Sequence, residues 1–171
     1  MDEFERLVEA YRARASSSAV SRLSVLMDLE GSRDPRVVPF LLEILADPRE
    51  TPRVRMYVLK QLRNAPQVVP PANRPAAANA ARDALVGSRD ADLRIQAALT
   101  LGQLTDVDGV LSMLGDVCLT EHESIDLRYA AFTSLERAGP TPECIALLRE
   151  IAPDETLGLV ARNILSAWHI E

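Results

Sequence analysis

One short run of the sequence combines residue types that bind metals, because Glu121, His122 and Glu123 are consecutive. A protein metal centre needs ligands that converge from more than one element. The sequence holds only two histidines, and the other, His169, lies near the far end of the chain. We therefore interpret residues 121–123 as a solvated turn and expect neither a metal site nor another cofactor.

Two cysteines, Cys118 and Cys144, could in principle form a disulfide. In the repeat described below, Cys144 corresponds to Val110, and Cys118 lies eight residues beyond Val110. The pair is then offset by about 12 Å along the helix axis, at a rise near 1.5 Å per residue. A disulfide needs Cα atoms within about 7 Å of each other. We expect two free, buried thiols.

Three arginines, Arg55, Arg94 and Arg128, occupy equivalent positions in successive segments and could bind carboxylates through their planar forks. In one reading they form an internal ladder, in which each guanidinium bonds an acidic or carbonyl group in a neighbouring turn. Candidate acids in those turns are Glu50, Asp90 and Glu123. In the other reading the row binds an acidic peptide or another carboxylate-rich partner. The pattern favours the ladder, and both can hold in part.

A repeat positions these residues. Five segments, which begin at Ala19, Val54, Leu93, Leu127 and Leu157, start 30 to 39 residues apart. Apolar residues recur four and eight positions on, and in most segments also eleven positions on, which marks one face of an amphipathic helix. The residues eight positions after the five starts are Met27, Leu62, Leu101, Leu135 and Leu165. Periods of this length are typical of helical solenoids.

A second set of apolar stripes lies between these segments, so the sequence predicts five helix pairs in one all-α domain, 1–171. The expected pairs span about 2–31, 34–64, 73–104, 106–138 and 141–169. Asp34-Pro35, Thr51-Pro52 and Thr141-Pro142 resemble helix starts. Gly31, Gly87 and Gly139 are expected to close helix ends in the left-handed conformation. Trp168 lies eleven positions after Leu157, on the apolar face, so we interpret it as a core residue that closes the last repeat. The alternative is an exposed residue that anchors a partner.

A proline-rich loop, 65–75, interrupts the repeat. Its four prolines cannot all be helical. The simplest interpretation is a spacer between the second and third pairs. Alternatively, its adjacent valines, Val68 and Val69, dock onto a partner.

Composition narrows the class of partner. The chain has 171 residues, 47 % of them apolar, which suits a folded domain. Its net charge is −6, whereas nucleic-acid binders usually carry a basic stripe, so we expect no nucleic-acid partner. The absence of a long apolar run argues against a membrane span. The acidic start, Met1 to Glu5, is unlike a signal peptide, and we expect a cytoplasmic location.

The polar side of the repeated helices is the predicted binding surface. Helical repeats present such residues as an extended strip, and Tyr and Arg are frequent binding hot spots. Besides the three arginines, the candidates are Tyr57, Lys60, Gln61, Gln96, Thr100, Gln103, Thr133, Arg137 and Asn163. The alternative for each residue is an ordinary solvated position.

Two segments, Asp92–Gly102 and Asp126–Leu135, resemble the second helix of bacterial HEAT-like repeats, which runs Val/Leu-Arg, two variable residues, then small residues and a Leu. Val54-Arg55 begins a third copy, whereas Val20 and Gly158 stand at the arginine position of the first and last copies. The resemblance covers nearly the full length. It implies a right-handed superhelix of helix pairs, a right-handed α-solenoid, whose second helices line the concave side.

The resemblance implies a non-catalytic scaffold that holds a peptide or protein on its concave face. Some HEAT-like proteins are enzymes, so a lyase that handles bilins or a metal-dependent hydroxylase is the alternative from the enzyme class. A binder of damaged DNA is a third hypothesis, since some glycosylases have HEAT-like folds. The single His-Glu dyad and the acidic charge argue against these two alternatives.

Overall fold

The structure, a computed structural model, describes residues 1–13, 18–64 and 69–171, and these residues form helices and connecting turns without any strand. The ten α-helices are α1 (Glu3–Ala13), α2 (Ala19–Asp28), α3 (Val37–Ala46), α4 (Pro52–Asn64), α5 (Arg74–Gly87), α6 (Ala91–Leu101), α7 (Val110–Leu119), α8 (Ile125–Glu136), α9 (Pro142–Ile151) and α10 (Gly158–Ala167). A short 3-10 helix, η2 (Pro71–Asn73), precedes α5. The prediction of an all-α fold is confirmed.

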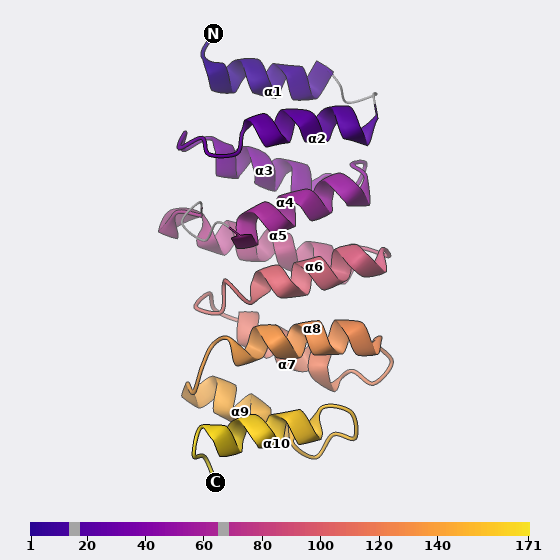
Figure 1. Cartoon of the computed structure of the whole chain (residues 1–171), viewed down its shortest axis with the longest axis vertical. Coiled ribbons are helices and arrows are strands. Elements are labelled where there is room, and N and C mark those ends of the chain that lie inside the picture. Colours follow the sequence, from indigo (N-terminus) through magenta and orange to yellow (C-terminus); the bar gives the residue numbers. More distant parts are fainter. Residues whose placement is uncertain (14–17, 65–68) are drawn as a thin grey trace.

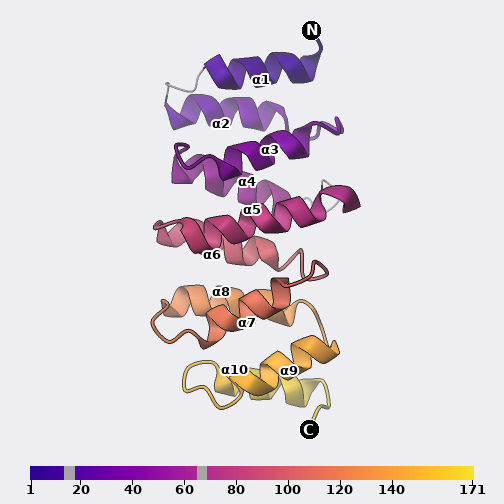
Figure 2. The ribbon, with the colours of Figure 1, turned by 180° about the vertical axis from the view of Figure 1, so that it is seen from behind.

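The helices follow one another along the long axis, with the two termini at opposite ends (Figure 1). Consecutive helices pack as pairs, and the second helices also pack on one another, α2 on α4, α4 on α6 and α6 on α8. Among the first helices, α3 packs on α5 and α7 on α9. The second helices face the viewer in Figure 1, and the first helices α3, α5, α7 and α9 face the viewer from behind in Figure 2.

The core follows the apolar register of the repeat. Leu62, Leu101 and Leu135 hold equivalent places on α4, α6 and α8, and each is at most 3 % exposed. Burial of a leucine side chain stabilises the fold by roughly 2 kcal/mol. In α5 all the buried positions except Leu85 are alanines, which let this helix approach α3 and α6 closely. Trp168, just after α10, is half-buried against the same core.

Side chains cap several helices as the sequence suggests. Thr141 accepts a hydrogen bond from the Cys144 N–H at 3.2 Å, and Thr51 accepts one from the Val54 N–H at 3.4 Å. The expected start at Asp34-Pro35 is early, because α3 begins at Val37. The Asp34 carboxylate instead accepts from the Arg36 N–H at 2.9 Å.

Two of the three expected glycine closures are confirmed. Gly31 and Gly139 have φ values of 81° and 75°, in the left-handed region. The expectation for Gly87 is wrong, because this residue ends α5 within the helix itself and Ser88 follows in an extended conformation. A helical residue has negative φ and needs no glycine, so Gly87 is free of that constraint.

The register expected for the first repeat is wrong at Met27, whose side chain is 55 % exposed. Leu26 and Leu29 are buried in its place. Their spacing from Arg22 matches that of Leu59 and Leu62 from Arg55. The polar residue Arg22 therefore belongs at the arginine position where the sequence alone suggested Val20.

The proline-rich loop lies partly outside the described residues, which exclude 65–68 and with them Ala65 and Val68. Its described part ends in η2, and Arg74 then starts α5 with Pro75 in the first turn. Val69 is only 6 % exposed and joins the hydrophobic core. Its burial contradicts the alternative in which this valine docks onto a partner.

Candidate functional site

Buried hydroxyl groups join the second helices α4, α6 and α8. The Thr100 hydroxyl of α6 donates to the Leu59 carbonyl of α4 at 3.1 Å. One pair further along, the Ser134 hydroxyl of α8 donates to the Ala98 carbonyl of α6 at 2.8 Å. Both hydroxyl-bearing residues are 1 % exposed. These bonds fix three neighbouring helices against one another at equivalent positions.

Thr100 was predicted as part of the binding surface, and that prediction is wrong. The Thr100 hydroxyl also contacts the Gln96 carbonyl of its own helix at 2.8 Å, so its hydrogen bonds are made inside the protein. Its position on the flank of α6 faces α4 and not solvent. The helical pattern placed it on the polar side but did not reveal that this flank is covered by the neighbouring helix.

The arginine row is an internal ladder at Arg94 and Arg128. Arg94 donates from Nε to the Leu85 carbonyl at 2.8 Å, and its two terminal nitrogens reach the Glu123 carboxylate at 2.7 and 2.8 Å. Arg128 donates from Nε to the Cys118 carbonyl at 2.8 Å and from Nη2 to Asp154 at 2.9 Å. Each arginine thus joins its own first helix to the turn of the following pair.

The other expected partners of the ladder differ from the prediction. Arg55 donates from Nε to the Leu45 carbonyl at 2.9 Å and forms no ion pair with Glu50. Asp90 caps α6 by accepting from the Leu93 N–H at 2.8 Å. Because Arg128 is 4 % exposed, its predicted role on an exposed binding surface is wrong. Its guanidinium group is buried and donates to two acceptors inside the protein, so it does not face solvent.

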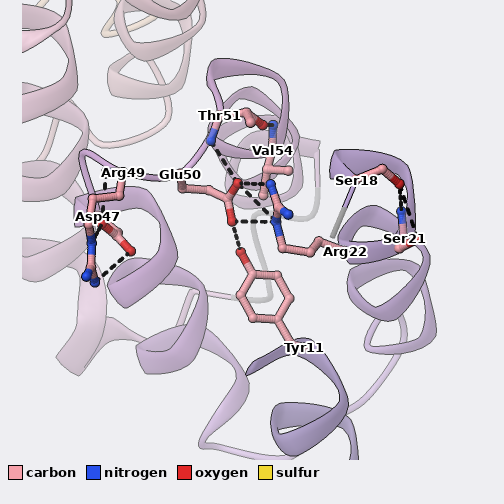
Figure 3. Close-up of polar contacts among 9 residues, drawn as sticks. All are labelled: Tyr11, Ser18, Ser21, Arg22, Asp47, Arg49, Glu50, Thr51 and Val54. Carbon is pink, nitrogen blue, oxygen red and sulfur yellow. Dashed lines mark hydrogen bonds and ion pairs between the residues drawn. The ribbon is translucent and has the colours of Figure 1, made fainter. Parts of the chain in front are cut away.

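The ladder has a fourth member, Arg22, which the sequence reading missed (Figure 3). Its Nε and Nη2 reach both oxygens of Glu50, at 2.8 to 3.2 Å, and the two side chains are 7 % and 8 % exposed. Tyr11 of α1 donates its hydroxyl to the same carboxylate, and the Thr51 N–H donates at 2.7 Å. The spacing of Arg22 from Val25, Leu26 and Leu29 was the signal that could have identified it.

The groove beside this cluster, about 560 Å³, has Tyr11, Arg22 and Glu50 in its lining. Burial alone raises the pKa of the Glu50 carboxyl, but the hydrogen bonds from Arg22, Tyr11 and Thr51 outweigh it and lower that pKa. Burial and the Glu50 carboxylate raise the pKa of the Tyr11 hydroxyl. An ionised carboxylate whose oxygens already accept these bonds suits a structural clamp better than acid–base chemistry.

At the last pair Gly158 replaces the arginine. A Cβ at Gly158 would collide with the Ala152 carbonyl oxygen, so the backbone of the preceding turn occupies the space of a side chain. The same carbonyl accepts a hydrogen bond from Arg162, one turn further along α10. The terminal repeat therefore keeps the link between its helices by a different route.

The remaining surface candidates fall into two groups. Lys60, Thr133, Arg137 and Asn163 are exposed. Tyr57, Gln61, Gln96 and Gln103 are half-buried. Of these, Tyr57 and Gln61 donate to the Glu30 carboxylate in the turn after α2, the latter at 3.2 Å. Gln96 accepts from Arg63 Nη1 of α4 at 2.8 Å.

The sequence reading missed the apolar and basic members of this surface. Tyr129 and Leu159 are 40 % and 62 % exposed on α8 and α10, and Ile95 is half-buried at the equivalent position of α6. Arg63 was also missed, although its helical spacing from Lys60 was visible. We name the exposed side of α4, α6 and α8, with Lys60, Arg63, Ile95, Gln96, Leu99, Gln103, Tyr129, Thr133 and Arg137, the strip.

The residues at 121–123 do not assemble a ligand set. Glu121 and His122 are exposed, whereas Glu123 is held by Arg94. Across residues 1–13, 18–64 and 69–171, no group of three or more His, Cys, Asp or Glu side chains gathers in a metal-binding arrangement. The interpretation as a solvated turn fits Glu121 and His122, while Glu123 belongs to the ladder.

Both cysteines are free and buried, as predicted. Cys118 donates from Sγ to the Arg128 carbonyl at 3.8 Å, and Cys144 donates to the Leu135 carbonyl at 3.3 Å. Burial raises the pKa of the Cys118 thiol to about 12 and that of Cys144 to about 11. Thiols in this state are poor nucleophiles.

Comparisons with known proteins return no match: no protein-family model, no curated protein and no solved structure is significantly similar to this chain. Within the part of the chain that the structure describes, no helix has both the length and the apolar character to cross a membrane.

Proposed function

We propose that this chain is a HEAT-like α-solenoid, a right-handed superhelix of five helix pairs, that works as a scaffold without catalysis. In this proposal the second helices form the concave face, and a peptide or protein partner binds along the strip. A cytoplasmic location agrees with two free, buried thiols.

The observation that carries the proposal is the buried hydroxyl connection between α4, α6 and α8. It holds the backbones of three helices in fixed register, so the exposed side chains between them are arranged before any partner arrives. Preorganisation of this kind lowers the entropic cost of binding. The strip also mixes apolar, aromatic and basic side chains, which are typical of protein interfaces.

Site-specific photocrosslinking tests this proposal. A benzophenone amino acid is placed at Lys60 or Thr133 on the strip, or at Asn79 or Ser112 on the first helices α5 and α7 as matched controls. All four positions are exposed. In lysate of the native host we expect the same discrete crosslinked protein from Lys60 and Thr133 and none from the controls. Equal crosslinking from both faces, or none from either, would contradict the proposal.

The two alternatives can be tested on protein purified from the native host. A HEAT-repeat enzyme related to bilin lyases or metal hydroxylases would carry a chromophore or a metal, which an absorption spectrum and elemental analysis detect. A binder of DNA lesions would shift damaged duplexes in a gel at low salt. For the scaffold we expect no stoichiometric metal, no visible absorption and no such shift.

A further inference from the structure

Two arginines on the strip differ from the ladder arginines Arg22, Arg94 and Arg128 in their partners. In the ladder each guanidinium forms an ion pair with a carboxylate: Arg22 with Glu50, Arg94 with Glu123 and Arg128 with Asp154. Among the residues that the structure describes, neither Arg63 nor Arg137 forms an ion pair with a carboxylate. They are cations without an internal counter-charge.

Arg63 and Arg137 lie on either side of α6. Arg63 extends from the last turn of α4 and donates from Nη1 to Gln96 of α6 at 2.8 Å, which fixes its guanidinium over that helix. Arg137 directly follows α8, on the other side of α6, and is exposed. Partial burial and the nearby positive charge of Arg137 lower the pKa of Arg63. Of these two causes burial is the larger, and repulsion from Arg137 is the second.

A negative partner relieves this repulsion. Like charges that interact are unfavourable for each other, and a carboxylate of a partner at each guanidinium replaces this repulsion by attraction. A guanidinium binds a carboxylate through two parallel hydrogen bonds, and at Arg63 one terminal nitrogen remains beyond the one that Gln96 uses. Lys60 adds an exposed cation on α4, and Gln103, just after α6, contributes a half-buried neutral polar group.

The strip also carries apolar side chains. Ile95 and Leu99 of α6 are half-buried, and Tyr129 of α8 is 40 % exposed. A peptide supplies apolar side chains between its charges, and these can cover the apolar side chains of the strip. The combination of separated cations and apolar side chains fits a peptide whose acidic and apolar residues alternate.

We propose that the strip recognises an acidic peptide segment, with carboxylates at Arg63 and Arg137 and apolar side chains over Ile95 and Leu99. This inference rests on the proposed scaffold function and names the chemistry of the partner. In this proposal Arg63 and Arg137 bind the carboxylates of the partner in place of the predicted row Arg55, Arg94 and Arg128. The guanidinium groups of Arg94 and Arg128 are already paired inside the protein.

The test is fluorescence anisotropy with a labelled twelve-residue peptide of alternating Glu and Leu. The matched probes replace every Glu by Gln or by Lys. We expect saturable binding of the Glu peptide at low salt, and about tenfold weaker binding by Arg63→Ala and by Arg137→Ala. Arg33→Ala and Arg89→Ala change the net charge equally at exposed positions outside the strip and are expected to retain wild-type affinity.

Several outcomes overturn the inference. They are an absence of binding of the Glu peptide to the wild type, binding of the Gln peptide equal to that of the Glu peptide, or equal losses in the Arg33 and Arg89 controls. Tighter binding of a single-stranded oligonucleotide through Arg63 and Arg137 would also overturn it in favour of a nucleic acid. Crosslinks from Lys60 and Thr133 that persist without Glu-peptide binding would show a scaffold whose partner is not acidic. If neither the crosslinks from Lys60 and Thr133 nor binding of the Glu peptide were observed, the proposed scaffold function would be rejected as well.

Discussion

Arg94 of α6 and Glu123 of the turn before α8 face each other through two parallel hydrogen bonds of 2.7 and 2.8 Å. The same guanidinium bonds the Leu85 carbonyl at the end of α5 through Nε. One side chain therefore ties together three segments that belong to two successive helix pairs. The arrangement recurs at Arg128, and Arg22 pairs in the same way with Glu50, in the turn of the following helix pair.

Replacement of Arg94 by Ala is expected to lower the free energy of unfolding by about 2 kcal/mol, because Glu123 and the Leu85 carbonyl lose a charged donor in a half-buried place. Arg94→Lys keeps the charge but not the fork, so it should recover less than half of the loss. Urea unfolding measures both. Arg89→Ala, a change of the same kind at an exposed residue of the neighbouring turn, serves as the control and should stay near the wild type. A loss of equal size at Arg89 would contradict the ladder as the cause.

The buried ion pair of Glu50 with Arg22 predicts a specific pH dependence of stability. The pKa of Glu50 is lowered below its usual 4.5. The ionised carboxylate therefore stabilises the fold fully above pH about 4.5, and this contribution is lost as the pH falls through the lower pKa of the folded state. Urea midpoints of the wild type and of Glu50→Gln should thus differ at pH 7 and converge toward acid pH.

A control for that experiment is Glu43→Gln, which removes an exposed carboxylate whose ion pair with Arg12 is 4.0 Å long. We expect its midpoint to follow the wild type at every pH, because exposed pairs contribute little to stability. If Glu43→Gln and Glu50→Gln gave the same pH profile, the burial of Glu50 would not be the source of the effect.

The sequence predicts the helices and most of the core because apolar spacing is a local property. Leu62, Leu101 and Leu135 repeat at a helical period, and all three are buried. The pattern failed at Met27, because a segment with apolar residues on several sides leaves its rotation open until its neighbours are known. The packing of α2 on α4 sets this rotation, and it buries Leu26 and Leu29 instead of Met27.

The candidate surface was harder to predict for a different physical reason. A helical wheel separates the buried side of a helix from its polar side, but it does not show which flank the next helix covers. Thr100 and Arg128 look like surface residues on such a wheel and are buried by neighbouring segments. The proposed role of Arg63 depends on the absence of a paired carboxylate among the described residues, and pairing between distant segments is not encoded in local spacing.

Two glycines form a matched pair for testing how closely the second helices approach. A Cβ at Gly102 would lie 2.7 Å from the Ser134 hydroxyl oxygen and 3.0 Å from the Ser134 Cα, so the backbone of α8 itself is in the way. Gly102→Ala is expected to lower the free energy of unfolding by about 2 kcal/mol. Gly87 has no heavy atom within 4 Å of its Cβ position, and Gly87→Ala should be neutral or stabilise by about 0.5 kcal/mol. Urea unfolding of the two variants tests the pair, and equal effects would contradict the close contact of α6 with α8.

The two buried thiols predict that chemical modification reports on unfolding. Arg128 and Cys118 are bonded in both directions, from Nε to the Cys118 carbonyl and from Sγ to the Arg128 carbonyl, so the thiol is reached only when this contact opens. Burial raises the pKa of the thiols to about 12 and about 11, which keeps both protonated at pH 8. We expect a disulfide reagent to react at least about 100-fold more slowly with the native protein than with the protein in urea. Variants with Cys118→Ala or Cys144→Ala assign the two rates, and a fast native reaction at Cys118 would mean that the end of α7 opens without global unfolding.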